Sequence, residues 1–262
     1  MSVITAQARK FGSTQTQDLP LAEECAVAMS YDGTTQAVLM ASPADLEDFG
    51  YGFSLTEGIA APGEIAEIAA ERVADGIDLR IWLHADAGQR FLHRRRTMVG
   101  PVGCGLCGVD TLAEAMRDLP VATGECVISA SELDAAVAGM DAGQALRDAT
   151  GATHAAGFFV PGRGLIALRE DVGRHNALDK LAGALIRQHP AGLAGQGAVV
   201  ITSRVSVDLV QKTAMLGAPV LIALAAPSSA AVAAARAAGI GLAARARSAA
   251  RAEIYAAPDR FR

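Results

Sequence analysis

The chain has few aromatic residues: they make up only 4% of its 262 residues, although 51% are hydrophobic. The core must therefore be filled by Ala, Val, Leu and Ile, as it is in buried strands and close-packed helices. A chain of this length can bury a sizeable core. The composition argues against a disordered protein and favours the α/β class.

The chain also lacks an excess of positive charge, since its net charge is -5. This balance argues against broad binding to nucleic acid or to an anionic membrane, but it is compatible with a local basic pocket. Residues 1–19 are polar and lack the apolar stretch of a secretory signal, so we expect a flexible tail and a cytoplasmic protein. The uncharged segment 213–235 contains Gly217, Pro219 and Pro227, which predict a strand between two helices and not a membrane span.

Only four cysteines are present, which argues against a disulfide framework in a chain without an export signal. Two of them, Cys104 and Cys107, lie in a glycine-rich segment shortly before Thr111, where a capping box with Glu114 predicts a helix. A helix start favours thiolate over thiol, and the thiolate is the nucleophile. Zinc ligation, disulfide chemistry and persulfide carriage all suit such a pair. No second Cys-x-x-Cys supplies the ligands of a structural zinc site, so no metal is expected.

The order of predicted elements indicates two domains after the tail. Residues 20–125 combine a hairpin around Asp32-Gly33, a helix starting at Ser42 and an alternating strand, 77–83, which together predict an α+β domain. Residues 126–262 predict an α/β domain with a mixed, largely parallel sheet. Its expected elements are a helix from Ser131, strands at 165–168, 198–202, 220–225 and 240–244, and helices at 206–216 and 229–238.

Polar loops follow several of these strands, at the sheet edge where open α/β folds bind ligands. They are 169–176, between the strand 165–168 and a helix, then Ser203-Arg204, and then 226–229. Helix-start amides and arginines in such loops bind phosphate oxygens. Arg245, Arg247 and Arg251 add local positive charge. In the alternative interpretation, Asp171, Arg174 and His175 cap a helix and pair with one another.

These residues together resemble the FdhD family of formate dehydrogenase accessory sulfurtransferases. The resemblance runs from about Glu24 to Tyr255 and is carried by five segments. They are Ser42-Pro43 through Thr56-Glu57-Gly58, Cys104-Gly105-Leu106-Cys107-Gly108, Thr153-His154-Ala155-Ala156, the run from Arg169 through Asp171, Arg174, His175 and Asn176 to Lys180, and the run from Arg204 to Lys212. This sequence departs from the family pattern at Ser203, where glycine is usual, and at Arg245, where phenylalanine is common.

The resemblance implies a C-terminal domain similar to the cytidine deaminase fold and a sulfurtransferase function. Its implied partners are a cysteine desulfurase, which donates persulfide sulfur, and formate dehydrogenase, with a homodimer as a further possibility. The sulfur acceptor is bis-molybdopterin guanine dinucleotide, of which GDP is a partial mimic. Cys104 is the implied carrier and Cys107 its helper. The residues expected to bind the cofactor are Arg174, His175, Ser203, Arg204, Ser228, Arg245, Ala246, Arg247, Ser248, Ala249 and Ala250.

Two rival functions remain open from the residues alone. One is a dithiol oxidoreductase, and the other is a nucleotide-cofactor-binding chaperone in which the cysteines are structural. A stably bound sulfur, a measurable disulfide potential, or function that survives loss of both thiols separates the three.

Overall fold

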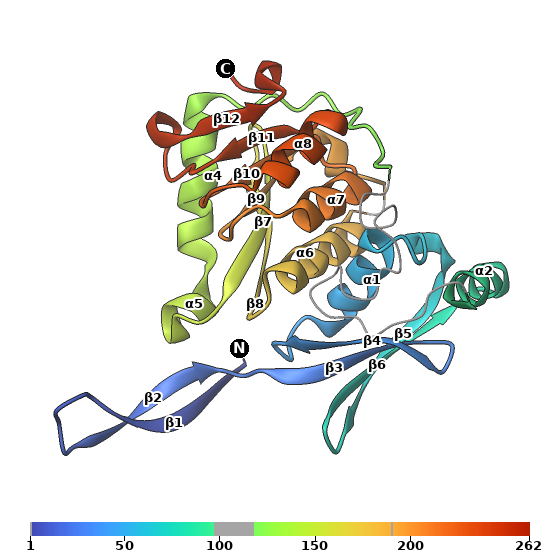
Figure 1. The fold of residues 1–262 in the computed structure, drawn as a ribbon, viewed down its shortest axis with the longest axis vertical. Helices are drawn as coiled ribbons and strands as arrows, with labels where there is room; N and C mark the ends of the chain where they lie inside the picture. Colours follow the sequence, from blue (N-terminus) through green and yellow to red (C-terminus); the bar gives the residue numbers. More distant parts are fainter. Residues whose placement is uncertain (1, 97–117, 190) are drawn as a thin grey trace.

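The computed structural model describes residues 2–96, 118–189 and 191–262 (Figure 1). The chain begins with an antiparallel hairpin of β1 (Val3–Arg9) and β2 (Thr16–Ala22), which extends away from the body of the protein in Figure 1. The flexible tail expected over 1–19 is therefore not observed. The polar sequence of this segment lacks the hydrophobic pattern that predicts a strand. The pairing of β1 with β2 nevertheless satisfies the backbone hydrogen bonds of the segment, while its side chains stay largely exposed.

The N-terminal sheet has four strands in the order β4-β3-β6-β5. Its strands are β3 (Cys25–Tyr31), β4 (Thr34–Ala41), β5 (Ile65–Val73) and β6 (Gly76–Leu83). Asp32 and Gly33 have φ angles of 46° and 78°, which confirms the predicted tight turn between β3 and β4. Alternate residues of β6 are buried, as its sequence pattern predicts. The helices of this half are α1 (Leu46–Thr56) and α2 (Ala85–Arg96), with a short 3-10 turn at Pro62–Glu64.

Helix α1 starts three residues later than the sequence predicts. Its N-cap is Asp45, which has a left-handed backbone and makes no side-chain capping bond. The hydroxyl of Ser42, expected to cap the helix, instead accepts a hydrogen bond from the backbone N–H of Val172 at 3.2 Å. The predicted cap is wrong because the distant C-terminal part of the chain binds this hydroxyl.

The C-terminal sheet has six strands in the order β12-β11-β10-β9-β7-β8. They are β7 (His154–Val160), β8 (Gly164–Asp171), β9 (Ala198–Ile201), β10 (Val220–Ala223), β11 (Gly241–Ala244) and β12 (Glu253–Ala256). Only β9, β10 and β11 are parallel to one another, and every other neighbouring pair is antiparallel. The sheet is therefore mixed but not largely parallel, because the hairpin of β7 and β8 extends it on one side.

Helices cover both faces of this sheet (Figure 1). Helices α6 (Arg174–Gln188), α7 (Val207–Leu216) and α8 (Ser229–Ala237) pack on one face, and α4 (Ala130–Gly143) packs on the other. Helix α5 (Ala145–Thr150) follows α4, and 3-10 turns occupy Ala194–Gln196, Ala249–Arg251 and Pro258–Arg260. The predicted alternation of strands and helices after residue 197 is confirmed. In the described part of the chain, no helix has the length and apolar character to cross a bilayer.

The start of α4 also differs slightly from the prediction. Ser129, and not Ser131, is the N-cap, and Ser129 and Glu132 form a capping box. A serine precedes either possible start, so the sequence alone places this boundary only to within two residues.

The two halves meet where α1 packs against α6. A Cβ on Gly52 would lie 1.6 Å from the carbonyl oxygen of Asp179, and one on Gly183 would lie 1.8 Å from that of Asp48. Only glycine fits at both positions, so the helix backbones are in direct contact. The expected domains, 20–125 and 126–262, therefore share a tightly packed interface. The likeness to cytidine deaminases stays a prediction.

Candidate functional site

Three loops meet at the carboxyl edge of the parallel strands. The loop after β9 is joined to the loop after β10 by hydrogen bonds from Val205 N to Ala226 O at 3.1 Å and from Ser228 N to Val205 O at 2.9 Å. The loop after β11 joins them through a bond from Arg245 N to Ala225 O at 3.0 Å. The loops after β9 and β10 are two of those that the sequence predicts at this edge, and together with the loop after β11 they form one continuous surface. It is the candidate site, and we call it the strand edge.

Several of the residues expected to bind the cofactor have side chains that already form hydrogen bonds or pack within the protein. Ser203 is buried, and its hydroxyl donates to the carbonyl of Arg204 at 3.1 Å. The Ser228 hydroxyl caps α8 by accepting from Ala231 N at 3.2 Å. Ala246 is fully buried. Ser203 and Ala246 shape the strand edge and leave only their backbone groups to meet a ligand, whereas Ser228 is exposed and its hydroxyl can still donate to one.

The arginines of the strand edge are its most available cationic groups. Arg204 and Arg247 are exposed, and their side chains have no hydrogen bond or ion pair with the residues that the structure describes. Arg245 is exposed too, has a left-handed backbone with φ 54°, and lies 3.7 Å from Glu253. Unpaired guanidinium groups around one surface favour an anionic ligand such as a phosphate.

The remaining expected residues lie beside these loops. Ser248 is half-buried and precedes the 3-10 turn, Ala249 donates its backbone N–H to Asp134 at 2.7 Å, and Ala250 is exposed. The segment 245–250 is thus held to α4 through Ala249, which fixes its position next to the strand edge.

His175 joins the strand edge from α6 and pairs with an acid on α7. Its Nε2 lies 3.1 Å from Oδ2 of Asp208, which also accepts from the Ser206 hydroxyl at 3.0 Å. Burial by itself would raise the pKa of Asp208, but the hydrogen bonds from His175 and Ser206 outweigh it and lower that pKa. Asp208 was not predicted as a site residue. Its place in the first turn of α7, two residues after Ser206, is the signal that could have found it.

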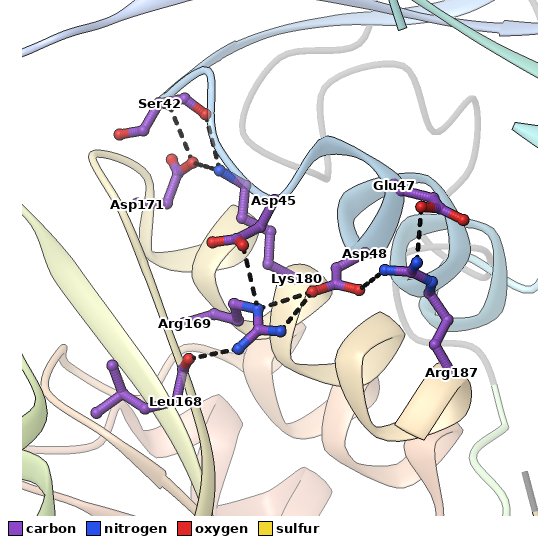
Figure 2. A network of polar contacts seen from close by, with 9 residues as sticks. All are labelled: Ser42, Asp45, Glu47, Asp48, Leu168, Arg169, Asp171, Lys180 and Arg187. Atoms are coloured by element: carbon purple, nitrogen blue, oxygen red, sulfur yellow. Dashed lines mark hydrogen bonds and ion pairs between the residues drawn. The ribbon is translucent and has the colours of Figure 1, made fainter. Parts of the chain in front are cut away.

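The run from Arg169 to Lys180 does not act as one unit. His175 pairs with Asp208 of α7, and Arg174 is close enough to help lower the pKa of Asp208. Asp171, in contrast, is fully buried and lies beside Ser42 of the N-terminal half (Figure 2). Oδ2 of Asp171 accepts from Lys180 Nζ at 2.6 Å and from the backbone N–H of Ser42 at 3.0 Å. Asp171 also accepts from Gly173 N at 2.7 Å, but α6 has no side-chain capping bond, so the alternative in which these residues cap the helix and pair with one another is wrong.

Two further ion-pair groups fasten the halves together. Asp48 of α1 lies between Arg169 and Arg187, with contacts of 2.7 and 2.6 Å (Figure 2). In the second group, Lys212 donates to Asp179 at 2.8 Å and to Thr56 at 3.1 Å. Burial would lower the pKa of Lys212, but the Asp179 carboxylate raises it. Arg169, Asp171 and Lys180 of the polar run therefore hold the two halves together, while Arg174 and His175 stay the residues of this run that are expected to bind a ligand.

Both candidate sulfur-carrying thiols, Cys104 and Cys107, lie outside the described residues, as does most of the helix expected from Thr111. Of the other two cysteines, Cys126 is buried, and burial raises its pKa to about 11. Cys25 is half-buried. The described residues contain no group of three His, Cys, Asp or Glu side chains arranged for a metal ion.

The sequence and the fold both match members of a known family. The family model described as the FdhD/NarQ family matches residues 22–262. The sulfur carrier protein FdhD of Agrobacterium fabrum is 46% identical over 231 residues, which cover 87% of this chain and 84% of that protein. Its counterpart from Brucella abortus is 51% identical over 213 residues, 80% of this chain and 78% of that protein.

A crystal structure supports the same relationship. A protein from Desulfotalea psychrophila, proposed as a formate dehydrogenase accessory protein, superposes with a TM-score of 0.73 at 25% identity and covers 99% of this chain and 98% of that chain. The family model extends over nearly the whole chain, and the relatives exceed 40% identity over most of it. The chain therefore belongs to the FdhD/NarQ family.

Proposed function

We propose that this protein is a cytoplasmic sulfur carrier that accepts persulfide sulfur from a cysteine desulfurase and delivers it to bis-molybdopterin guanine dinucleotide for formate dehydrogenase. Membership of a family whose relatives are named sulfur carrier proteins supports the sulfur chemistry. The strand edge is the observation that supports binding of the nucleotide. There, Arg204, Arg247 and Arg174 surround loops that lead into the first turns of helices.

In the sulfur step, Cys104 is the nucleophile. Its thiolate attacks the outer sulfur of the desulfurase persulfide, the S–S bond of that persulfide breaks, and the desulfurase cysteine leaves as a thiolate. Cys104 then carries the sulfur as its own persulfide. The glycines at 103 and 105 give this residue the backbone freedom to meet two partners in turn.

Release of the sulfur needs two electrons, and Cys107 is placed in sequence to supply them. Attack of the Cys107 thiolate on the Cys104 sulfur frees hydrosulfide and leaves a Cys104–Cys107 disulfide, so electrons balance. The hydrosulfide is the group that the molybdenum substrate receives. A cellular dithiol must then reduce the disulfide before the next cycle.

At the strand edge, this chain binds and orients the nucleotide part of its substrate. Arg174 and Arg204 pair with phosphate oxygens, and the first-turn amides of α6 and α7 donate to the same groups. The buried side chains of Ser203 and Ala246 keep the loops in place behind them.

The sulfur assignment is tested by loading the Cys104→Ser and Cys107→Ser variants with desulfurase and cysteine, followed by peptide mass spectrometry. We expect a gain of one sulfur on Cys104 in the Cys107→Ser variant and none in Cys104→Ser. Sulfur retained on Cys107 in the Cys104→Ser variant, with formate dehydrogenase still activated, contradicts the assignment. Full activation without either thiol would favour the chaperone function, and a reversible disulfide with no bound sulfur would favour the oxidoreductase.

The nucleotide site is tested by calorimetry with GDP. We expect binding that is weakened at least about tenfold in Arg204→Ala and Arg174→Ala, because each loses a charge-assisted phosphate contact. Arg163→Ala is the matched control, since Arg163 lies in the β7–β8 turn at the opposite end of the same sheet. Equal weakening by all three substitutions contradicts the site.

A further inference from the structure

His154 belongs to the Thr153–Ala156 segment, which the proposed function leaves without a role. It is the first residue of β7 and lies opposite Asp171 in the pairing with β8. Alternate residues of a strand face the same side of a sheet. Ala156 and Phe158 pack in the core beneath α6 and α7, so His154 faces that side too, at the N-terminal end of α6.

The loop after β9 lies next to His154. Ala155 donates its backbone N–H to the Thr202 hydroxyl at 3.0 Å, and Thr202 N returns a bond to Ala155 O at 3.1 Å. Thr202 immediately precedes Ser203 and Arg204. The backbone therefore brings His154 to the strand edge, between that loop and the first turn of α6.

The charged groups around His154 are mainly positive. Burial lowers the pKa of His154, and Arg174 and His175 from α6 lower it further. Asp208 on α7 offsets His175, to which it is paired at 3.1 Å. Asp171, its neighbour on β8, is committed to Lys180 at 2.6 Å.

Two groups in this cluster have room for another partner. Arg174 and His154 form no side-chain hydrogen bond or ion pair within residues 2–96, 118–189 and 191–262. Helix α6 begins after Gly173, which has no side chain to cap its first amides. Two basic side chains and open helix-start amides together match the oxygens of a phosphate.

We propose that His154 contacts a phosphate of the guanine nucleotide bound at the strand edge and takes up a proton when that phosphate binds. The proposal rests on the proposed function, because it concerns the same nucleotide site. A bound phosphate neutralises the field of Arg174 and His175, so it removes the repulsion that keeps His154 neutral. The proton comes from solvent, and no covalent step is involved.

Proton uptake makes nucleotide affinity depend on pH. Free His154 has a lowered pKa, and a bound phosphate raises that pKa. Between the two values, binding takes up a proton, so affinity strengthens as pH falls through this window and is constant above and below it. One titrating group changes the dissociation constant by at most about tenfold per pH unit.

The experiment is calorimetry of GDP with the full chain at pH 8 and pH 6, each in two buffers of different ionisation heat. We expect affinity to rise about threefold to tenfold more between pH 8 and pH 6 in the parent protein than in His154→Gln. On binding GDP, the parent protein should also take up about half a proton more than His154→Gln does. GDP titrates by itself near pH 6, but this contribution is common to both proteins and cancels. His84→Gln, at an exposed site in the N-terminal half, is the control and should match the parent.

Two outcomes count against the proposal in different ways. If His154→Gln binds GDP with the parent's pH dependence, the proton is not on His154, and the proposed nucleotide site still stands. If the parent does not bind millimolar GDP at either pH, the nucleotide site itself fails. Should His154→Gln not fold, NMR titration of the His154 ring in the parent decides. A pKa that rises with GDP supports the proposal, and an unchanged one overturns it.

Discussion

The buried pair of Asp171 and Lys180 allows a quantitative test of the interface between the two halves. Both side chains are fully buried, and Nζ lies 2.6 Å from Oδ2. The two partners are not equally supported by their other contacts. Asp171 also accepts from Ser42 N, Gly173 N and Asn176 Nδ2, at 3.0, 2.7 and 2.9 Å. Within the described part of the chain, Lys180 otherwise contacts only the Ser42 carbonyl at 2.8 Å and the face of the Phe49 ring at 5.6 Å.

This asymmetry predicts different costs for losing each partner. Asp171→Asn leaves the Lys180 ammonium group buried without an anion. The NH2 group of the new asparagine also faces N–H donors that the carboxylate had accepted, so we expect the free energy of unfolding to fall by about 3–5 kcal/mol. Lys180→Met leaves a carboxylate that keeps three N–H donors, and we expect about 1–3 kcal/mol. The double variant removes both charges and should therefore be more stable than Asp171→Asn alone.

Urea unfolding measures these differences. Fluorescence of Trp82, the single tryptophan, reports on β6 of the N-terminal half, and far-ultraviolet circular dichroism reports on both halves. Arg147→Met is the control, because Arg147 makes only an exposed side-chain contact with Asp141 at 3.7 Å and should cost under about 0.5 kcal/mol. The reasoning is refuted if Lys180→Met costs as much as Asp171→Asn, or if the double variant is no more stable than Asp171→Asn.

Three further predictions concern packing, pH and capping. Gly183→Ala forces a methyl group against the carbonyl of Asp48 and should lower the free energy of unfolding by about 3 kcal/mol, measured by thermal melting. Gly63→Ala is the control, because open space surrounds Gly63 and the substitution should be nearly neutral. Equal melting temperatures of the two variants would contradict the close contact between the helices. Folding lowers the pKa of His154, so the stability that this residue contributes is present above about pH 6.5 and is lost as pH falls toward the pKa of the folded state. The urea midpoint of His154→Gln should therefore change less with pH over that range than the midpoint of the parent protein. An unchanged pH dependence of the midpoint would count against this prediction. Ser129→Ala removes the cap of α4 and should cost about 1 kcal/mol, measured by urea unfolding, whereas Ser131→Ala, outside the capping box, should cost less.

Much of the fold could be predicted because local patterns record which residues face the interior. The alternation of β6 and the Asp32-Gly33 turn predicted their elements correctly, as did the breakers Gly217 and Pro219. The position of the strand edge followed from a general rule: loops that follow parallel strands lie at the same side of a sheet. These inferences need only residues close together in the chain.

The roles of individual polar side chains could not be predicted in this way. Ser42 has the sequence context of a helix cap, yet its hydroxyl binds Val172, which is 130 positions away. Arg169 and Arg174 look alike in sequence, but Arg169 pairs with Asp48, 121 positions away, while Arg174 lies near His154 and Asp208. The pairing of β1 with β2 likewise depends on backbone hydrogen bonds that leave no hydrophobic pattern.

By itself, the sequence determined the alternation of strands and helices after residue 197 and the family of the protein, and it predicts Cys104 and Cys107 as the thiols that carry sulfur. Only the tertiary structure divided the run from Arg169 to Lys180 into residues that hold α1 against α6 and residues that face the strand edge. It also placed His154 beside Arg174. Periodicity reports whether a side chain is buried, but the identity of its partner depends on how distant segments pack, because a buried charge is stable only where an opposite charge from elsewhere in the chain reaches it.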